Sequence, residues 1–351
     1  MMFASDNWAG AAPEIIDAIA RANDGPAPAY GGDPLTARVE ERFNDVFDCK
    51  TSVYFVSTGG AANGLALSAF TPPYGMIIAH EESHIQMDEC GGVELLTGGA
   101  KILPVAGAAA KLTPDALDAA LGGFPDRAPH GCPPRAVSLT QATECGAVYA
   151  PEELHAVCAR ARAAGLKVHM DGARFANAVS HLGCAPADIS WRAGVDVLCF
   201  GATKNGCLAA EAVVFFGDHD AEDFAYRRKR AGHLWSKQRF IAAQFDAYFT
   251  DDLWLRLAAH ANAAARRLAD GLAAIDGVTI WYPTQANEVF ASFPDGVDEA
   301  LRAAGAAFYP WVTPGDPANG TMQRLICSFR TKMEDVDAFV ARAEAVIPTF
   351  A

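Results

Sequence analysis

Lys204 lies just past the end of an apolar run, within the glycine-flanked segment GATKNG (201–206). The run itself, VDVLCFG (195–201), has the composition of a buried strand. An ammonium group beyond an interior strand either reaches solvent or contacts a partner that offsets the cost of its desolvation. A solvated turn lysine is one interpretation of Lys204, and a lysine that reacts with a carbonyl compound is the other.

A glycine pair follows another apolar run. The segment STGGAANG (57–64) comes directly after TSVYFV and opens a predicted helix. Gly59 and Gly60 allow close approach to the backbone, and the N–H groups of Gly60, Ala61 and Ala62 would lie at the positive end of that helix. The segment therefore suits a phosphate group, although an ordinary capped turn explains the same residues.

A carboxylate and a guanidinium follow a third apolar run, in HMDGAR (169–174). A lone carboxylate such as Asp171 is often a helix cap. The functional alternative is an acid that stays ionised because it pairs with a cation, with Arg174 nearby as a further charged donor.

The segment HEESH, from His80 to His84, matches the HExxH pattern of zinc hydrolases. That pattern needs both histidines on one face of a long helix and a third ligand farther along the chain. TPPYG (71–75) lies only a few residues upstream and Gly91-Gly92 follows soon after, so little helix can form here. The alternatives are that His84 alone projects into a ligand site, or that it bonds within a loop.

Together, these four sets match the requirements of pyridoxal phosphate. That cofactor needs an anion cradle, a carboxylate on its pyridinium nitrogen, a flat partner against its ring and a lysine that condenses with its aldehyde. Gly59-Gly60, Asp171, His84 and Lys204 supply these in turn. The sequence therefore predicts a pyridoxal phosphate site, and we expect no metal ligand.

The elements that must position these residues alternate between strands and helices. Helical patterns such as 151–165 separate short apolar runs, which is typical of a mostly parallel sheet covered on both faces. We expect an α/β fold whose ligands bind at the carboxyl ends of the strands. The predicted strands are 51–57, 75–79, 100–105, 135–141, 166–172, 195–201 and 211–217.

From about residue 250 the pattern changes to α+β. A long alanine-rich helix over 252–275 leads into further short segments and a final helix over 333–347. We predict a large ligand-binding domain over 1–250 and a smaller C-terminal domain over 251–351. The short segments are GVTIWYP (277–283), NEVFASF (287–293), DEALRAAGAAF (298–308) and RLICSFR (324–330).

Composition narrows the range of partners. The formal net charge of −14 over 351 residues disfavours nucleic acid and anionic membranes as partners. No apolar run approaches the roughly 20 residues of a membrane helix, and the start MMFASDNWAG does not have the pattern of a signal peptide. Nine scattered cysteines are typical of reduced thiols, so we expect a cytoplasmic protein.

The chain as a whole resembles the threonine aldolases, which are fold-type-I pyridoxal phosphate enzymes of the aspartate aminotransferase-like fold. The likeness is greatest to the bacterial low-specificity L-threonine and L-phenylserine aldolases, which also carry a TQATE segment (140–144). It extends over nearly the whole chain. The segments that carry it are SDN (5–7), AYGGDP (29–34), FVSTGGAAN (55–63), SHIQMDECGG (83–92), HMDGARFANA (169–178), GATKNG (201–206) and RLICSF (324–329).

The resemblance implies roles for the residues that would hold the cofactor. Lys204 would form the Schiff base, Asp171 would pair with the pyridinium nitrogen, and His84 would stack on the ring and serve as a candidate base. The phosphate would lie against Gly59, Gly60 and Ala61.

The resemblance also implies residues around the substrate. Arg174 would bond to the cofactor or the substrate, and Ser5, Tyr30 and Arg324 would contact the substrate, with Arg330 as the alternative partner of its carboxylate. Lys229, in RRKR (227–230), would reach a neighbouring subunit's cofactor or else belong to a solvated face.

Two positions depart from the pattern of the family. Gly60 stands where many relatives have a threonine, so one side-chain bond to the phosphate is missing. Glu144 stands where another branch has a histidine. We expect Glu144, directly or through a water, to accept the proton of the β-hydroxyl group while His84 mainly stacks, because burial and nearby Asp171 would raise its pKa. The alternative is that Glu144 caps a turn.

The implied reaction is retro-aldol cleavage of L-threonine, L-allo-threonine or a related L-β-hydroxy-α-amino acid such as phenylserine to glycine and an aldehyde. A homodimer or homotetramer with sites at the subunit interface is also implied. Another pyridoxal phosphate reaction on the same fold, such as β-elimination or transamination, is the nearest alternative. A zinc hydrolase that uses HEESH and a non-catalytic acidic globular protein are the others.

Overall fold

The computed structural model describes residues 1–351 except 125–126, 218–222, 313–316, 319 and 347–351. Its main element is a seven-stranded sheet of order β1-β7-β6-β5-β4-β2-β3, in which only β7 runs against its neighbours. All seven predicted strands are confirmed within two residues at each end. They are β1 (Thr51–Val56), β2 (Met76–His80), β3 (Lys101–Val105), β4 (Pro134–Thr140), β5 (Lys167–Gly172), β6 (Val197–Gly201) and β7 (Glu211–Phe216).

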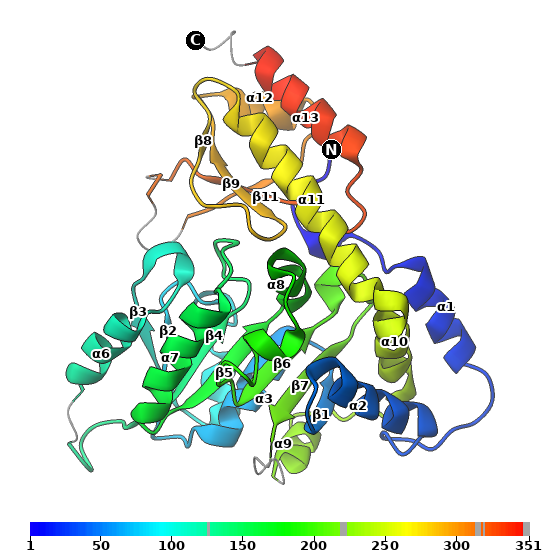
Figure 1. The fold of residues 1–351 in the computed structure, drawn as a ribbon, viewed down its shortest axis with the longest axis vertical. Coiled ribbons are helices and arrows are strands. Elements are labelled where there is room, and N and C mark those ends of the chain that lie inside the picture. The colour runs from blue at the N-terminus through cyan, green and yellow to red at the C-terminus, as the bar shows by residue number, and fades with distance from the viewer. Residues whose placement is uncertain (125–126, 218–222, 313–316, 319, 347–351) are drawn as a thin grey trace.

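Helices cover both faces of this sheet, as the apolar strands require (Figure 1). The α2, α7, α8 and α10 helices pack into the largest core cluster on one face, and α3, α5 and α9 pack on the other. The α/β class and the mostly parallel sheet predicted from the sequence are confirmed. The helices of this part are α1 (Pro13–Ala22), α2 (Pro34–Phe47), α3 (Gly59–Phe70), α4 (His84–Met87), α5 (Gly92–Thr97), α6 (Pro114–Gly122), α7 (Pro151–Ala163), α8 (Phe175–Leu182), α9 (Phe224–Arg230) and α10 (Arg239–Phe249).

A second, antiparallel sheet of order β10-β11-β9-β8 lies at the other end of the molecule (Figure 1). The long helix α11 and the last helix, α13, pack against it around a separate core cluster. The predicted last residue of the final helix, 347, lies outside the described residues. The elements of this part are α11 (Leu253–Ala273), β8 (Thr279–Ile280), β9 (Glu288–Ser292), α12 (Val297–Ala303), β10 (Tyr309–Pro310), β11 (Gln323–Ile326) and α13 (Met333–Val346).

The N-terminal residues join this smaller part. Phe3 is fully buried in its core cluster, and the Ile326 N–H donates to the Phe3 carbonyl at 2.8 Å. Met2 forms a parallel bridge with Ala307. The domain boundaries at 1–250 and 251–351 stay a prediction. Among the described residues, no helix is both long and apolar enough to cross a membrane.

Candidate active site

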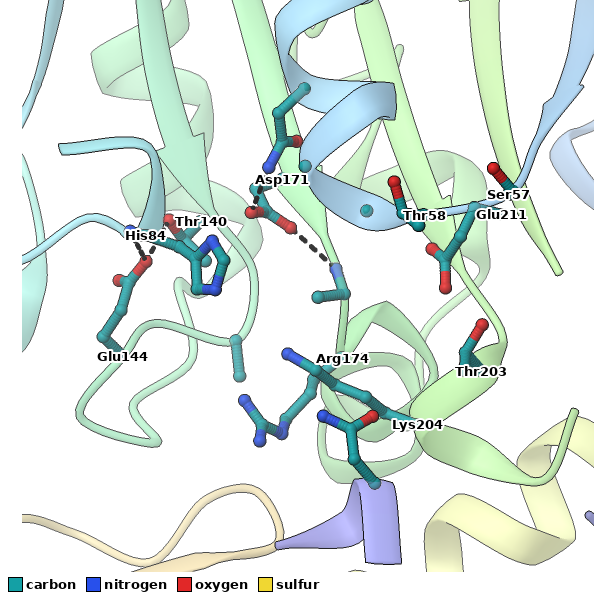
Figure 2. Close-up of a pocket in the computed structure, with 16 residues that line it drawn as sticks. Ser57, Thr58, His84, Thr140, Glu144, Asp171, Arg174, Thr203, Lys204 and Glu211 are labelled. Carbon is teal, nitrogen blue, oxygen red and sulfur yellow. Dashed lines mark hydrogen bonds between the residues drawn. The ribbon is translucent and has the colours of Figure 1, made fainter. Parts of the chain in front are cut away.

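A cavity of about 310 Å³ lies at the carboxyl edge of the large sheet (Figure 2). The carboxyl ends of β1, β2, β4, β5 and β6 all lie at this edge, because these strands run parallel to one another. Seven predicted site residues line the cavity together: Gly59, Gly60, His84, Glu144, Asp171, Arg174 and Lys204.

Lys204 lies in a short 3-10 helix, η4 (Thr203–Asn205), that follows β6. Its side chain is half-buried and lines the cavity. Within the described part of the chain, its Nζ forms no hydrogen bond or ion pair, although the charges of Asp6 and Glu211 lie near enough to interact with it. An amine held in a cavity without a bonding partner is available to a ligand.

Asp171 is held in place by its own neighbours. It is 6 % exposed at the end of β5, its Oδ1 accepts from the Ala173 N–H at 2.9 Å and its Oδ2 accepts from Asn63 Nδ2 at 2.8 Å. These two donors fix the orientation of the carboxylate. The arrangement suits a carboxylate that pairs with a cation in the cavity.

His84 begins α4 and is oriented by a carboxylate behind it. Its Nδ1 lies 2.9 Å from Glu89 Oε1, which also accepts from Asn63 Nδ2 at 2.8 Å. The hydrogen bond with Glu89 raises the pKa of His84, and burial opposes this increase. Asn63 therefore connects Glu89, the partner of His84, to Asp171, so the ring and the two carboxylates are fixed as one unit.

Glu144 follows β4 and lies at the opposite end of the cavity from Glu211 (Figure 2). Its Oε1 accepts from the His84 N–H at 2.9 Å and from Thr140 Oγ1 at 3.0 Å, while its Oε2 is buried without a hydrogen-bond partner. Burial, with a smaller contribution from Asp171, raises the pKa of Glu144 to about 7. The direction and both causes agree with the sequence prediction.

The start of α3 has the form of an anion cradle. Thr58 caps the helix, and its Oγ1 accepts from the Ala61 N–H at 3.3 Å, while the Ala62 N–H donates to the Thr58 carbonyl at 3.0 Å. The donors predicted at Ala61 and Ala62 are therefore already engaged. Within the described residues, the N–H groups of Gly59 and Gly60 have no partner, so these two remain for a ligand.

Arg174 is the N-cap residue of α8 and lies in a buried charge cluster. It donates to Asp6 from Nε at 2.8 Å and from a terminal nitrogen at 3.2 Å, and its Nη2 lies 3.4 Å from Glu288 Oε1. Although burial opposes ionisation, Arg174 and Lys204 lower the pKa of Asp6. Burial raises the pKa of Glu288, against the effects of Arg174 and Arg324.

The other residues expected around the substrate lie outside the lining of this cavity. Ser5 caps the short helix η1 (Asp6–Trp8), and its Oγ accepts from Asn7 N–H, a lining residue, at 3.1 Å. Arg324 lies on β11 with its guanidinium 3.9 Å from the Trp311 ring centre, and its Nε is buried without a hydrogen-bond partner. Arg330 donates to the Ala11 carbonyl at 2.6 Å.

Tyr30 and Lys229 lie on the surface and contact each other. Lys229 Nζ lies 4.8 Å from the centre of the Tyr30 ring, which is 52 % exposed. Neither lines the cavity of its own chain, so their expected roles at a substrate or a neighbouring cofactor stay predictions.

The HEESH segment does not form a zinc-protease helix. His80 is the last residue of β2 and His84 the first of α4, so the two rings do not share a helix face. The His80 Nε2 lies 2.9 Å from the Gly107 carbonyl and its Nδ1 3.1 Å from the Glu82 backbone nitrogen. Among the described residues, no three His, Cys, Asp or Glu side chains are grouped as metal ligands.

The cavity fits pyridoxal phosphate in the kinds of groups that it offers. The free N–H groups of Gly59 and Gly60 suit the phosphate, the fixed carboxylate of Asp171 suits the pyridinium nitrogen, and the unbonded amine of Lys204 suits the aldehyde. His84 presents a flat ring on the side of the cavity that holds Glu144 (Figure 2).

Several residues of the site were not assigned roles from the sequence. Asn63 and Glu89 lie within segments that already stood out, so their proximity to the cradle and to His84 was the available signal. Asp6, Glu288 and Glu211 reach the site through contacts between distant segments. Asp6 lies in the SDN segment of the resemblance, and the signal at Glu288 and Glu211 was a charge within or beside an apolar run.

Comparison with known proteins identifies several relatives. Residues 2–294 match the beta-eliminating lyase family. A protein of Pseudomonas aeruginosa named low specificity L-threonine aldolase is 47 % identical, with 95 % of this chain and 94 % of that protein covered. Another protein of that name, from Pseudomonas sp. (strain NCIMB 10558), is 43 % identical, with 98 % of this chain and 97 % of that protein covered.

Solved structures are consistent with the likeness to threonine aldolases. The Leishmania major threonine aldolase superposes with a TM-score of 0.91 at 28 % identity, over 99 % of both chains. The serine palmitoyltransferase of Sphingomonas wittichii superposes with a TM-score of 0.73 at 19 % identity, over all of this chain and 88 % of the other, which shows a shared fold alone.

Proposed function

The chain belongs to the beta-eliminating lyase family and, within it, to the low-specificity L-threonine aldolases, and from this membership we propose that it cleaves L-threonine, L-allo-threonine and related L-β-hydroxy-α-amino acids to glycine and an aldehyde. The observation that carries the proposal is the 47 % identity over 95 % of the chain. The cavity that holds Lys204, Asp171 and His84 supports it.

The cofactor supplies the electron sink. When bound, pyridoxal phosphate would supply the site for the substrate amino group and the sink for the electron pair of the Cα–Cβ bond. We assign Lys204 as the amine that holds the cofactor and is displaced by the substrate. Asp171, fixed by Asn63 and Ala173, keeps the ring nitrogen protonated by charge pairing.

Proton transfer is assigned to the side of the cavity that holds Glu144 and His84. Glu144 accepts the β-hydroxyl proton, directly or through a water, because its Oε2 has no partner and its pKa lies near 7. His84 stacks on the ring and is held in that orientation by Glu89.

Two guanidinium groups are candidates for the substrate carboxylate. Arg174 is already bonded to Asp6 and Glu288, whereas Arg324 keeps a buried Nε without a partner. We therefore assign Arg324 to the carboxylate and Arg174 to the frame of the site. Ser5, through Asn7, positions the rim on which the substrate would rest.

We place the protein in the cytoplasm as a homodimer or homotetramer. All nine cysteines are described and free of disulfides, which suits a reducing compartment. Tyr30 and Lys229 form a joint exposed surface, and we assign that surface to the cofactor site of a neighbouring subunit.

The reaction is tested with the purified protein loaded with pyridoxal phosphate. L-Threonine should yield glycine and acetaldehyde in equal amounts, and L-phenylserine should yield glycine and benzaldehyde. A 2-oxo acid with ammonia would instead indicate β-elimination, and a 2-oxo acid with an aminated cofactor would indicate transamination. Neither outcome is compatible with the proposed cleavage as the main reaction.

A further inference from the structure

Glu211 is a cavity residue that the proposed reaction does not use. It is the first residue of β7, lines the cavity and is 7 % exposed. Because β7 runs against β1 and β6, its start lies at the edge where those two strands end. Glu211 pairs with Val56 of β1 and Gly201 of β6, so it lies between the segment that leads to α3 and the segment that leads to Lys204.

The carboxyl group of Glu211 points into the anion cradle. A Cβ atom built on Gly59 would lie 4.0 Å from Glu211 Oε2, and one built on Gly201 would lie 3.1 Å from the same oxygen. Figure 2 shows Glu211 beside Ser57, Thr58 and Thr203. A carboxyl oxygen of Glu211 therefore lies near Gly59, at the start of the cradle where the phosphate is expected.

Within one subunit, the described residues of the cradle include few groups that could offset two negative charges. Its lining side chains near Glu211 are the hydroxyls of Ser57, Thr58 and Thr203, and the cation that acts on Glu211 is Lys204. Lys204 is assigned to the aldehyde, and its amine is uncharged when it condenses. An ionised Glu211 beside a phosphate dianion would then be two like charges in a buried site, which is strongly unfavourable.

The surroundings of Glu211 already favour its neutral form. Burial raises the pKa of Glu211 to about 7, with Thr203 and Lys204 opposing and Asp171 adding to the increase. On the remaining sides lie neutral groups. These are Cys199 on β6, Cys207 after η4, Tyr248 on α10 and the Ser57 hydroxyl on the end of β1, which lies 2.8 Å from His233 Nδ1.

We propose that Glu211 is protonated in the loaded protein and donates a hydrogen bond to the cofactor phosphate, so that cofactor binding is coupled to the uptake of one proton. The inference rests on the proposed placement of the phosphate against Gly59 and Gly60. It makes Glu211 a further cofactor-binding residue, and cofactor affinity decreases as the pH rises above 7 because the free carboxyl group must first regain its proton.

The test uses pyridoxine 5′-phosphate, whose alcohol cannot condense with Lys204, and the cofactor-free protein. Between pH 7 and pH 9 the Kd of the wild type should rise by up to about tenfold per pH unit, and the Kd of Glu211→Gln should stay nearly constant. Glu144→Gln is the matched control. It removes a carboxyl group of similar pKa at the other end of the cavity and should keep the wild-type slope.

Calorimetry in buffers of different ionisation enthalpy gives a second measure that needs no variant. At pH 8 the wild type should take up close to one proton more with pyridoxine 5′-phosphate than with pyridoxine. Equal slopes in the wild type and Glu211→Gln, or no phosphate-dependent proton uptake, would overturn the role of Glu211 alone. Equal affinities of the wild type for the two ligands would overturn the placement of the phosphate as well.

Discussion

At the residue scale, the two buried glutamates of the cavity have similar pKa values and different neighbours. Glu144 contacts the backbone of His84 and the hydroxyl of Thr140, whereas Glu211 contacts Thr203 beside the start of α3. One faces the side where the substrate hydroxyl is expected and the other faces the phosphate. We therefore expect the Glu144 carboxylate to accept a proton at one end of the cavity and the Glu211 carboxyl group to keep its proton at the other end.

Glu144→Gln tests the accepting role through the pH dependence of kcat. Because a base must be deprotonated to act, wild-type kcat should increase as the pH rises through about 7, the pKa to which burial raises Glu144. The glutamine variant should have a much lower kcat and no such increase, while cofactor binding is retained. Near-normal kcat in this variant, together with a severely impaired His84→Asn, would assign the base to His84.

Lys204→Ala should abolish covalent capture of the cofactor without unfolding the chain, since Nζ makes no hydrogen bond or ion pair among the described residues. Borohydride added to the loaded wild type should fix the cofactor on residue 204, as peptide mapping can establish. Lys101→Ala, at an exposed residue of β3, is the control and should still be labelled at position 204. Labelling of another lysine in Lys204→Ala would contradict the assignment.

Arg324→Ala should reduce kcat/KM for L-threonine by roughly 30- to 150-fold, because a charge-assisted pair is lost. This corresponds to about 2–3 kcal/mol of transition-state stabilisation. Arg330→Ala should have a small effect, since its guanidinium bonds to the Ala11 carbonyl. Measurement of kcat/KM for both variants decides which arginine binds the substrate carboxylate. If Arg330→Ala proves to be the damaging change, the carboxylate lies at the other arginine.

At the element scale, α11 and α13 approach so closely that one glycine separates them. A Cβ atom on Gly271 would lie 2.8 Å and 3.0 Å from the two γ carbons of Val340, whose branched side chain has little rotamer freedom. We expect Gly271→Ala to lower the free energy of unfolding by about 1–3 kcal/mol through overpacking.

Gly122→Ala in α6 is the matched control for that change. Its Cβ would have nothing within 4 Å, so the better helix propensity of alanine should raise stability by up to about 1 kcal/mol. Urea unfolding of both variants should therefore give shifts of opposite sign. A Gly271→Ala protein as stable as wild type would mean that the two helices can separate at little cost.

The sequence predicts the strand ends well because long apolar runs determine where parallel strands stop and polar side chains begin. Lys204, Asp171 and Glu144 each follow such a run, and the sheet brings them together. Glu211 could not be placed in this way, because it begins its strand. Only the antiparallel direction of β7, which the apolar run EAVVFF does not reveal, brings the start of that strand to the same edge.

Contacts between residues far apart in the chain could not be predicted from the sequence either. Arg174 could be identified as a site residue, but its bonds to Asp6 join positions 168 residues apart. The resemblance pointed to the SDN segment as a substrate contact. Ser5 of that segment stays the predicted contact, while the neighbouring Asp6 accepts hydrogen bonds from Arg174 and, at 3.1 Å, from Asn287.

At the scale of the whole molecule, the first eight residues connect the two sheets. The ring centres of Phe3 and Phe339 lie 5.2 Å apart in the smaller core, and Asp6 binds Arg174 at the edge of the large sheet. Phe3→Ala should lower the free energy of unfolding by about 3–5 kcal/mol, since a fully buried aromatic ring is removed. Met2→Ala, at a residue that is 58 % exposed, should change it little.

Differential scanning calorimetry, with kcat measured well below the transition, checks this prediction. Loss of the anchor at Phe3 should also weaken cofactor binding, because Asp6 follows only three residues later. A Phe3→Ala protein with unchanged stability would show that the N-terminal segment merely lies on the smaller core.

The connection made by Phe3 constrains the order of events during synthesis. Ile326, whose N–H holds the Phe3 carbonyl, leaves the ribosome about 320 residues after its partner. At roughly 5–20 residues per second, that delay amounts to about 15–65 s. The Phe3 carbonyl must wait for this partner during that time, so the N-terminal segment reaches its final position on the smaller core only after Ile326 has emerged.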